Sequence, residues 1–221
     1  MHSKAATLGQ PTSASPAASR AEPRGKAEAI LAAAERAFLA GGFGAVSMDA
    51  IARAAGVSKA TVYAHFAGKE ELFGAVVADQ SQRRFDGFSA EALDPHDIAR
   101  SLYTIALRFL DLILSPEAIA LNRIIIGEVT RFPALGQVFW EAGPARTRVQ
   151  IEAFLRRAAA AGTLAVADPR LAAEQFLALA RGEIHQRSLL RLDGPADAAT
   201  LRASAAGAVD TFLRAFRVAE E

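Results

Sequence analysis

The stretch SMDAIARAAGVSKATVYAHFAGKEEL, residues 47–72, contains two short helical patterns separated by a glycine. Ser47 is a predicted N-cap for the first helix, because a serine side chain can accept a hydrogen bond from the first turn. Gly56 ends that helix, since glycine adopts the left-handed conformation of a C-cap without strain, and Ser58 caps the second. About three residues separate the two helices, so their axes must cross steeply. This is the outline of a helix-turn-helix.

Very few apolar side chains anchor the second helix: Val62 and Phe66 face inward, and Val57 supports them from the turn. Most of the helix surface therefore stays free, as a helix that enters the major groove of DNA requires. Hydroxyls, a cation, an aromatic ring and small alanines on that surface suit contacts with base edges. The pattern alone is equally compatible with an ordinary solvated face. The side chains concerned are Ser58, Lys59, Ala60, Thr61, Tyr63, Ala64 and His65.

The composition predicts an all-α globular protein. Of the 221 residues 52% are apolar, alanine is abundant, and polar positions recur at a spacing of three to four. The formal net charge of +1 does not by itself indicate a nucleic-acid partner. The chain has no cysteine and its four histidines are scattered, so we predict no disulfide, no thiolate chemistry, no metal site and no cofactor.

The N-terminal segment, residues 1–23, is rich in proline, serine and alanine, and we predict that it is a disordered arm. It lacks the apolar segment of a secretory signal. No stretch of the chain approaches the roughly 18 consecutive apolar residues of a membrane-spanning helix. We therefore predict a cytoplasmic protein with no membrane partner.

Caps and glycines predict further helices outside this stretch, nine or ten in all, and no strand. A helix after Gly25 is expected to stop at Gly41–Gly42, with Phe43 tucked into the core. Asp94–Pro95 is expected to open a later helix as its cap and first residue. Residues 121–129 are apolar nearly all round, which indicates a central helix. The long predicted helices span about 68–86, 169–192 and 196–217.

The quoted stretch matches, without a gap, the pattern Thr/Ser-x-x-x-Ile-Ala-x-x-Ala-Gly-Val-Ser-x-x-x-x-Tyr-x-x-Phe-x-x-Lys-Glu-x-Leu, the signature of the TetR family of transcriptional regulators. The chain resembles this family strongly over about residues 25–75. It departs from the pattern at Gly68, where the family often has a serine or asparagine cap. Residues 123–184 resemble the C-terminal domain of the AefR-like branch of the family.

The resemblance implies two domains after the arm. Residues 24–87 would form a three-helix DNA-binding domain, with the helix-turn-helix motif at about 47–66 and a connecting helix at its end. Residues 88–221 would form a larger helical domain for ligand binding and dimerisation. The expected fold class is therefore all-α, with an N-terminal helix-turn-helix domain.

The resemblance also assigns roles to residues of the motif. Ser47 and Lys69 would contact phosphates, and Tyr63 a phosphate or a base. Lys59 is the best candidate for a contact with either a base or a phosphate, and both stay open. For His65, contacts within the domain are the alternative to DNA. The other residues at or near the groove would be Ser58, Ala60 and Thr61.

A ligand pocket is expected between the helices in the middle of the chain, with apolar walls and Glu128 as a polar group that orients the ligand. Each wall residue could instead belong to the ordinary core. Glu128 could instead form an ion pair with Arg123 or Arg131, or cap a helix end. Arg181 and His185 are further polar candidates. The candidate ligand contacts are Phe109, Ile113, Ile125, Glu128, Trp140 and Phe176.

The function that the resemblance implies is a homodimeric repressor of transcription. Two recognition helices would occupy a roughly palindromic double-stranded operator and leave it when a small hydrophobic or aromatic effector binds the larger domain. The dimer would form through the last two long helices, about 169–192 and 196–217. Alternatively, the apolar residues along one face of these helices could pack within the monomer.

Two alternatives come from other functional classes. A helix-turn-helix module without small-molecule control remains compatible with the sequence. A helical enzyme would have to use Lys59, Tyr63 and His65 as acid and base, but no nucleophile arrangement or metal set accompanies them. We therefore predict that the chain is not an enzyme.

Overall fold

The computed structural model describes residues 25–85 and 92–218, and the regular elements in these ranges are all α-helices. The all-α prediction is confirmed, with eleven helices in the described residues where nine or ten were expected. The arm predicted for residues 1–23 lies outside the described ranges. The bounds of the eleven helices are α1 Lys26–Ala45, α2 Met48–Ala55, α3 Lys59–His65, α4 Lys69–Phe85, α5 Ile98–Ile113, α6 Pro116–Glu128, α7 Pro133–Ala142, α8 Pro144–Ala160, α9 Pro169–Arg181, α10 Ile184–Leu189 and α11 Ala198–Phe216.

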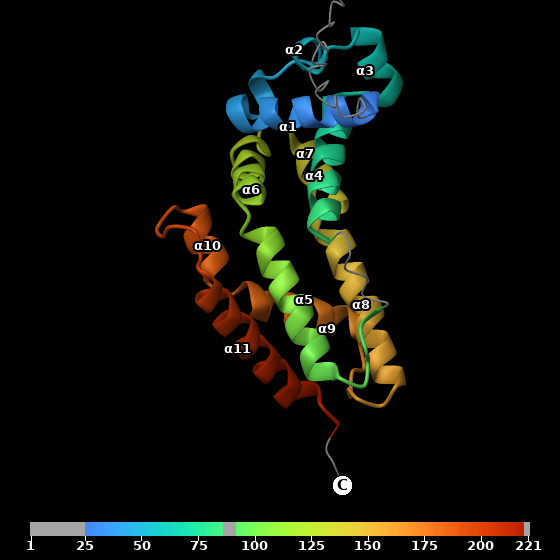
Figure 1. Ribbon diagram of the computed structural model, residues 1–221, viewed down its shortest axis with the longest axis vertical. Helices are drawn as coiled ribbons and strands as arrows, with labels where there is room; N and C mark the ends of the chain where they lie inside the picture. The colour runs from blue at the N-terminus through green and yellow to red at the C-terminus, as the bar shows by residue number, and fades with distance from the viewer. Residues whose placement is uncertain (1–24, 86–91, 219–221) are drawn as a thin grey trace, which may run out of the picture.

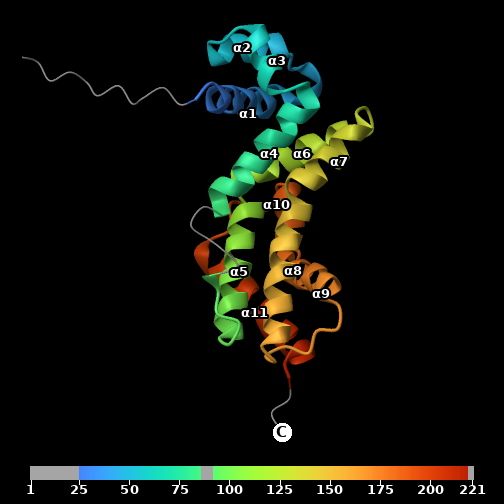
Figure 2. The ribbon, with the colours of Figure 1, turned by 90° about the vertical axis from the view of Figure 1, so that its right-hand side faces the viewer.

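The molecule is elongated, with α1, α2 and α3 at one end (Figures 1 and 2). Helix α4 runs from that end toward the middle, where α6 and α7 lie beneath α1. Helices α5, α8, α9 and α11 form the opposite end. Across the described ranges, each helix is too short or too polar to cross a lipid bilayer.

The first hydrophobic core joins α1–α4 to α6 and α7. Phe38, Phe43 and Phe73 are fully buried there, and the centroids of their rings lie 5.8, 5.3 and 5.6 Å apart. Leu121 of α6 and Leu135 of α7 belong to the same core. Burial of each such side chain stabilises the fold by about 1.5–3 kcal/mol. The helices that carry the helix-turn-helix are therefore packed directly onto α6 and α7.

Phe43 reaches this core because the chain leaves helical geometry at Gly42, where φ is 74° and ψ is 173°. Residues with a β-carbon rarely adopt that conformation, which costs them on the order of 1–3 kcal/mol. The predicted stop at Gly41–Gly42 and the predicted burial of Phe43 are both confirmed, although helical turns resume as far as Ala45.

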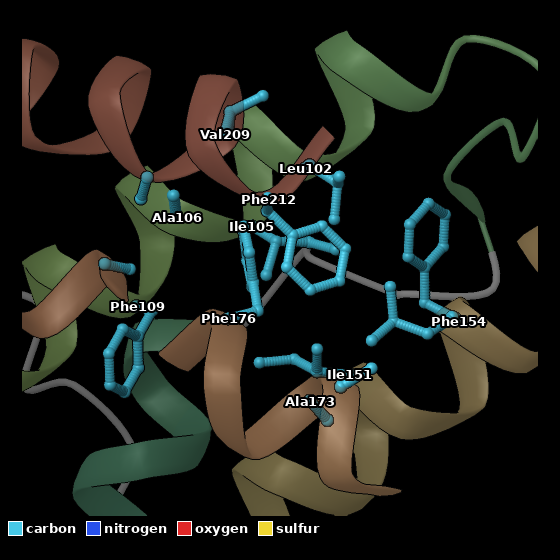
Figure 3. Packing of buried hydrophobic residues seen from close by; sticks show 14 of the residues in the cluster. Leu102, Ile105, Ala106, Phe109, Ile151, Phe154, Ala173, Phe176, Val209 and Phe212 are labelled. Carbon is cyan, nitrogen blue, oxygen red and sulfur yellow. The ribbon is translucent and has the colours of Figure 1, made fainter. Parts of the chain in front are cut away.

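A second core fills the opposite end of the molecule, between α5, α8, α9 and α11. Figure 3 shows Ile105 of α5, Phe176 of α9 and Phe212 of α11 pointing toward one another. The rings of Phe176 and Phe212 meet edge to face with their centroids 5.1 Å apart. This core holds the four helices together without help from α1–α3.

The predicted start of α5 was wrong. The helix begins at Ile98, with Asp97 as its N-cap. The Asp94 carboxylate accepts a hydrogen bond from the His96 amide at 2.8 Å, so the predicted cap belongs to the preceding turn.

Two other helix predictions also need correction. The helix expected over 169–192 is interrupted at Gly182, whose φ of 49° ends α9 before α10 begins. Helix α6 is not buried all round, since Ile126 is 62% exposed. Leu121 and Ile125 occupy the packed face, and Ile126 lies outside it.

Candidate DNA-binding surface and internal cavity

The turn between α2 and α3 has the geometry that its sequence predicts. The Ser47 hydroxyl accepts a hydrogen bond from the Ala50 amide at 3.2 Å. The Ser58 hydroxyl accepts one from the Thr61 amide at 3.1 Å. Gly56 is left-handed, with a φ of 69°, and its amide closes the end of α2. These local bonds determine where α3 begins, and both predicted caps are confirmed.

Helix α3 turns most of its surface to solvent. Val62 is fully buried and Phe66 is 9% exposed, so the two predicted anchors hold the helix down. Thr61 is half-buried, and its hydroxyl lies 2.8 Å from that of Ser58. The exposed side chains are Ser58, Lys59, Ala60, Tyr63, Ala64 and His65.

An exposed ion pair couples α3 to α2. The Lys59 ammonium lies 2.9 Å from Oδ1 of Asp49. The hydrogen bond to Asp49, and then its charge, raise the pKa of Lys59, so the side chain stays cationic at neutral pH. The ammonium also lies 5.9 Å from the centroid of the Tyr63 ring. Because exposed ion pairs are weak, Lys59 can exchange Asp49 for a group on DNA with little loss.

Lys69, predicted to contact a phosphate, directs its ammonium into the protein. Nζ donates to the carbonyl oxygens of Phe43 and Val46, both at 2.8 Å, and lies 3.4 Å from that of Gly44. Burial is the main cause that lowers the pKa of Lys69. These contacts join the end of α1 to the start of α4. In the absence of DNA these bonds already occupy the ammonium. The contact between Lys69 and a phosphate stays a prediction.

Glu128, predicted to face a ligand, holds the same connection from the end of α6. Its Oε1 accepts a hydrogen bond from the Gly44 amide at 3.0 Å. A β-carbon on Gly44 would lie 3.1 Å from that oxygen and 3.3 Å from Nη1 of Arg131, so the close approach depends on glycine. The carboxylate therefore bonds to the backbone at the end of α1 and is not among the residues that line the cavity described below.

A cavity of about 460 Å³ lies where helices α4 to α10 meet, and each of them contributes to its wall. Three of the predicted ligand contacts, Phe109, Ile113 and Trp140, line this cavity. Trp140 is 53% exposed, which places it at the open side. The volume falls in the range of sites for drug-sized ligands, about 300–1,000 Å³.

Ile125 and Phe176 do not line the cavity. Ile125 belongs to the first core, and Phe176 is fully buried in the second. Core packing, the alternative stated for both, agrees with these positions. In α9 the cavity residues lie on another face than Phe176, whereas in α6 Leu121 lies one turn before Ile125 and belongs to both the core and the cavity wall. An apolar pattern within one helix does not indicate which of these residues meets a cavity.

Polar side chains from several helices line the same cavity. Arg181 and His185, the further polar candidates, are among them, while Asn122 and Arg148 were missed by the sequence analysis. They come from four different helices, α6, α8, α9 and α10, so only the packing of the helices brings them together. Within the described ranges, no group of three acidic or histidine side chains is placed to hold a metal ion.

Two family models match the chain. Residues 30–76 match bacterial regulatory proteins of the tetR family, and residues 100–218 match the C-terminal domain of AefR-like transcriptional repressors. The chain belongs to the TetR family. The predicted resemblance is confirmed for both parts, and this TetR-family protein is a DNA-binding transcriptional regulator and not an enzyme.

Similar proteins agree with this assignment. The flavonoid-responsive regulator FrrA is 35% identical, with a TM-score of 0.72, and the match covers 88% of this chain and 98% of FrrA. A TetR-family structure from Mesorhizobium loti is 29% identical, with a TM-score of 0.74, over 87% of this chain and 97% of that one. The uncharacterised regulator TtgW of Pseudomonas putida is 33% identical over 106 residues, which are 48% of this chain and 76% of TtgW.

We expect Lys69→Met to lower the free energy of unfolding of this TetR-family regulator by about 1–3 kcal/mol, because methionine keeps the apolar stem but leaves partly buried carbonyls without a donor. Urea unfolding at one protein concentration measures the change. Lys59→Met is the matched control, and this exposed substitution should change the free energy by less than about 0.5 kcal/mol. Equal losses in the two variants would contradict the role of Lys69 at the end of α1.

Proposed function

We propose that this TetR-family regulator is a homodimeric repressor that occupies a roughly palindromic operator and leaves it when a small hydrophobic or aromatic effector enters the cavity. The observation that carries the proposal is the course of α4. Its first residue, Lys69, bonds the end of α1, and Val77 and Ser81 further along it line the cavity. Helix α4 thus contacts both the end of α1, which leads into α2 and α3, and the cavity proposed to hold the ligand.

The proposed DNA surface is the exposed side of α3 with its flanking caps. Two such helices in a dimer would lie about one DNA turn apart and enter successive major grooves. Ser47 at the start of α2 suits a phosphate, and Lys59 and Tyr63 lie together on the side that would face the duplex. Because its target is genomic DNA, we place the protein in the cytoplasm.

The proposed division of the chain at about residue 87 separates the helix-turn-helix from the helices around the cavity. The first core crosses this boundary, since Leu121 and Leu135 pack with α1–α4. A ligand that shifts α6 or α7 would therefore act on the DNA-binding helices through shared packing. Release of DNA requires that the ligand bind the two arrangements with different affinities.

We expect Lys59→Ala to weaken operator binding about tenfold, since one charge-assisted contact with a base is worth about 1–3 kcal/mol. Footprinting on the DNA that flanks the gene should first reveal a protected palindrome, and gel shifts over a salt series then measure affinity. A phosphate contact would also reduce the salt slope by about one unit, whereas a base contact would relax sequence preference.

The control for this substitution is Arg156→Ala, which removes a cation that is 67% exposed, against 60% for Lys59, on α8, a helix of the opposite end of the molecule. Its affinity for the operator should equal that of the unmodified protein. Wild-type affinity in Lys59→Ala would remove Lys59 from the DNA surface, and the absence of any protected palindrome would contradict the repressor proposal.

We expect a flavonoid such as naringenin to quench the fluorescence of Trp140 saturably and to release the operator over the same concentration range. FrrA is described as flavonoid-responsive, and Trp140 is the single tryptophan of this chain. Ala118→Phe should raise the flavonoid concentration needed for half-maximal quenching and for half-maximal release at least about tenfold, because a ring at this wall position fills part of the cavity.

Trp140→Phe is the control for the fluorescence signal, which it removes. Because phenylalanine keeps an aromatic ring in the cavity wall, the effector should still release the operator, although at a higher concentration. Undiminished quenching in Ala118→Phe would put the ligand outside the cavity. Quenching that saturates while the operator stays bound would favour a helix-turn-helix module without small-molecule control.

Apolar side chains on the outer face of α9 support the proposed dimer. Leu171 and Leu179 are 49% and 40% exposed, and Leu179 borders an open apolar groove between α9 and α11 that also contains Phe216. A second copy of the same pair of helices would cover this face in a four-helix bundle. Most TetR-family proteins form dimers, which agrees with this arrangement.

We expect Leu179→Glu to convert the dimer into a monomer, because the new carboxylate would be buried without a partner at the interface. Sedimentation-velocity ultracentrifugation should then give half of the original mass. Val149→Glu is the control: this α8 side chain is 53% exposed, and its replacement should leave the mass unchanged. A dimer that survives Leu179→Glu would contradict an interface through α9.

A further inference from the structure

One arginine of the cavity wall, Arg148, is paired with carboxylates of the protein. Nη1 of Arg148 lies 2.9 Å from Oε2 of Glu152, and both side chains are largely buried. Nε of Arg148 also lies 3.9 Å from Oε1 of Glu174, a second wall residue. Arg148 is thus paired with carboxylates on α8 and α9, each of which also contacts an exposed arginine, Arg156 or Arg170.

The second arginine in the wall has no such partner. The guanidinium of Arg181, the last residue of α9, is exposed and makes no hydrogen bond or ion pair with any of the described residues. It leaves one positive charge at this end of the cavity that the described carboxylates do not pair. An unpaired guanidinium beside an apolar space favours an oxyanion such as a carboxylate or a sulfonate, which it can bind through two parallel hydrogen bonds.

His185 lies in the same part of the wall, on α10. Its Nε2 is buried and has no hydrogen-bond partner among the described residues. Burial, and then the charge of Arg181, lower the pKa of His185, so the imidazole is neutral at pH 7. The ring therefore adds a polar group without adding charge. A buried polar atom without a partner is unfavourable until one is supplied.

The rest of the wall is suited to an aromatic body. Phe109 and Ile113 of α5, Phe139 and Trp140 of α7 and Leu177 of α9 surround the space with apolar and aromatic surface. A ligand with a ring system against these side chains and an acidic group at Arg181 would suit both kinds of wall residue.

We propose that the cavity selects aromatic monoanions, with the oxyanion held by Arg181 and the ring system held by the apolar wall. This inference rests on the proposed effector-binding function and narrows its ligand class. It assigns Arg181 as the residue that distinguishes an acidic aromatic ligand from a neutral one of the same shape. His185 lies at the same end, as a neutral polar neighbour of the oxyanion.

Two fluorescent probes with the same ring skeleton test the assignment. 8-Anilinonaphthalene-1-sulfonate is an anion, and N-phenyl-1-naphthylamine lacks the sulfonate. Titrations of the full-length protein give a dissociation constant for each probe. We expect Arg181→Gln to weaken binding of the sulfonate at least about tenfold and to change binding of the neutral probe less than about twofold, because only the sulfonate meets the lost charge.

Two further variants serve as controls. Arg181→Lys should recover part of the lost affinity for the sulfonate, since it restores the charge without the planar fork. Arg108→Gln removes an exposed cation of α5 that does not line the cavity, and both dissociation constants should stay unchanged. Ala118→Phe should weaken binding of both probes, and this loss would establish that they occupy the cavity.

The outcomes separate the two proposals. If both probes bind in a manner sensitive to Ala118→Phe, but Arg181→Gln affects them equally or not at all, the selection of anions is overturned and the effector cavity stands. If neither probe responds to Ala118→Phe, the cavity is not a ligand site, and the effector proposal and this inference both fail.

Discussion

The last residues of α1 and Val46, which follows them, have backbone groups that side chains of other helices bond, and the orientation of α2 and α3 depends on these bonds. Lys69 donates to the carbonyls of Phe43 and Val46, and Glu128 accepts from the amide of Gly44. The start of α4 and the end of α6 are therefore bonded to the same short segment. Because α2 and α3 follow it directly, the orientation of α3 relative to the rest of the molecule is set there.

Close packing carries that constraint toward the cavity. A β-carbon on Gly74 of α4 would lie 2.7 Å from Cγ1 of Val138 on α7, and one on Gly143 would lie 3.1 Å from Cγ1 of Val77 on α4. Helices in such close contact leave little space for one to move without the other. Since α7 carries Trp140 and α4 carries Val77 in the cavity wall, a displacement there reaches the helix that begins at Lys69.

The polar end of the cavity is held in place by α6. Arg123 donates to the carbonyls of Leu189 and Ser188, at 2.9 and 2.7 Å, and so bonds the end of α10 to the middle of α6. Helix α10 has only six residues and follows the break at Gly182, so it depends on such contacts for its position. The same helix carries His185, which places the unpartnered imidazole on a supported element next to Arg181.

The sequence by itself determined the helix-turn-helix. Ser47, Gly56 and Ser58 act within one turn of their own position, and Val62 and Phe66 are the apolar residues that a mostly exposed helix retains. Tertiary structure decided the surroundings of Lys69 and Glu128, whose partners lie more than twenty residues away in the chain. It also decided that Phe109 faces the cavity while Phe176 faces the core, because seven helices build that wall and periodicity within one helix does not indicate which neighbour each face will meet.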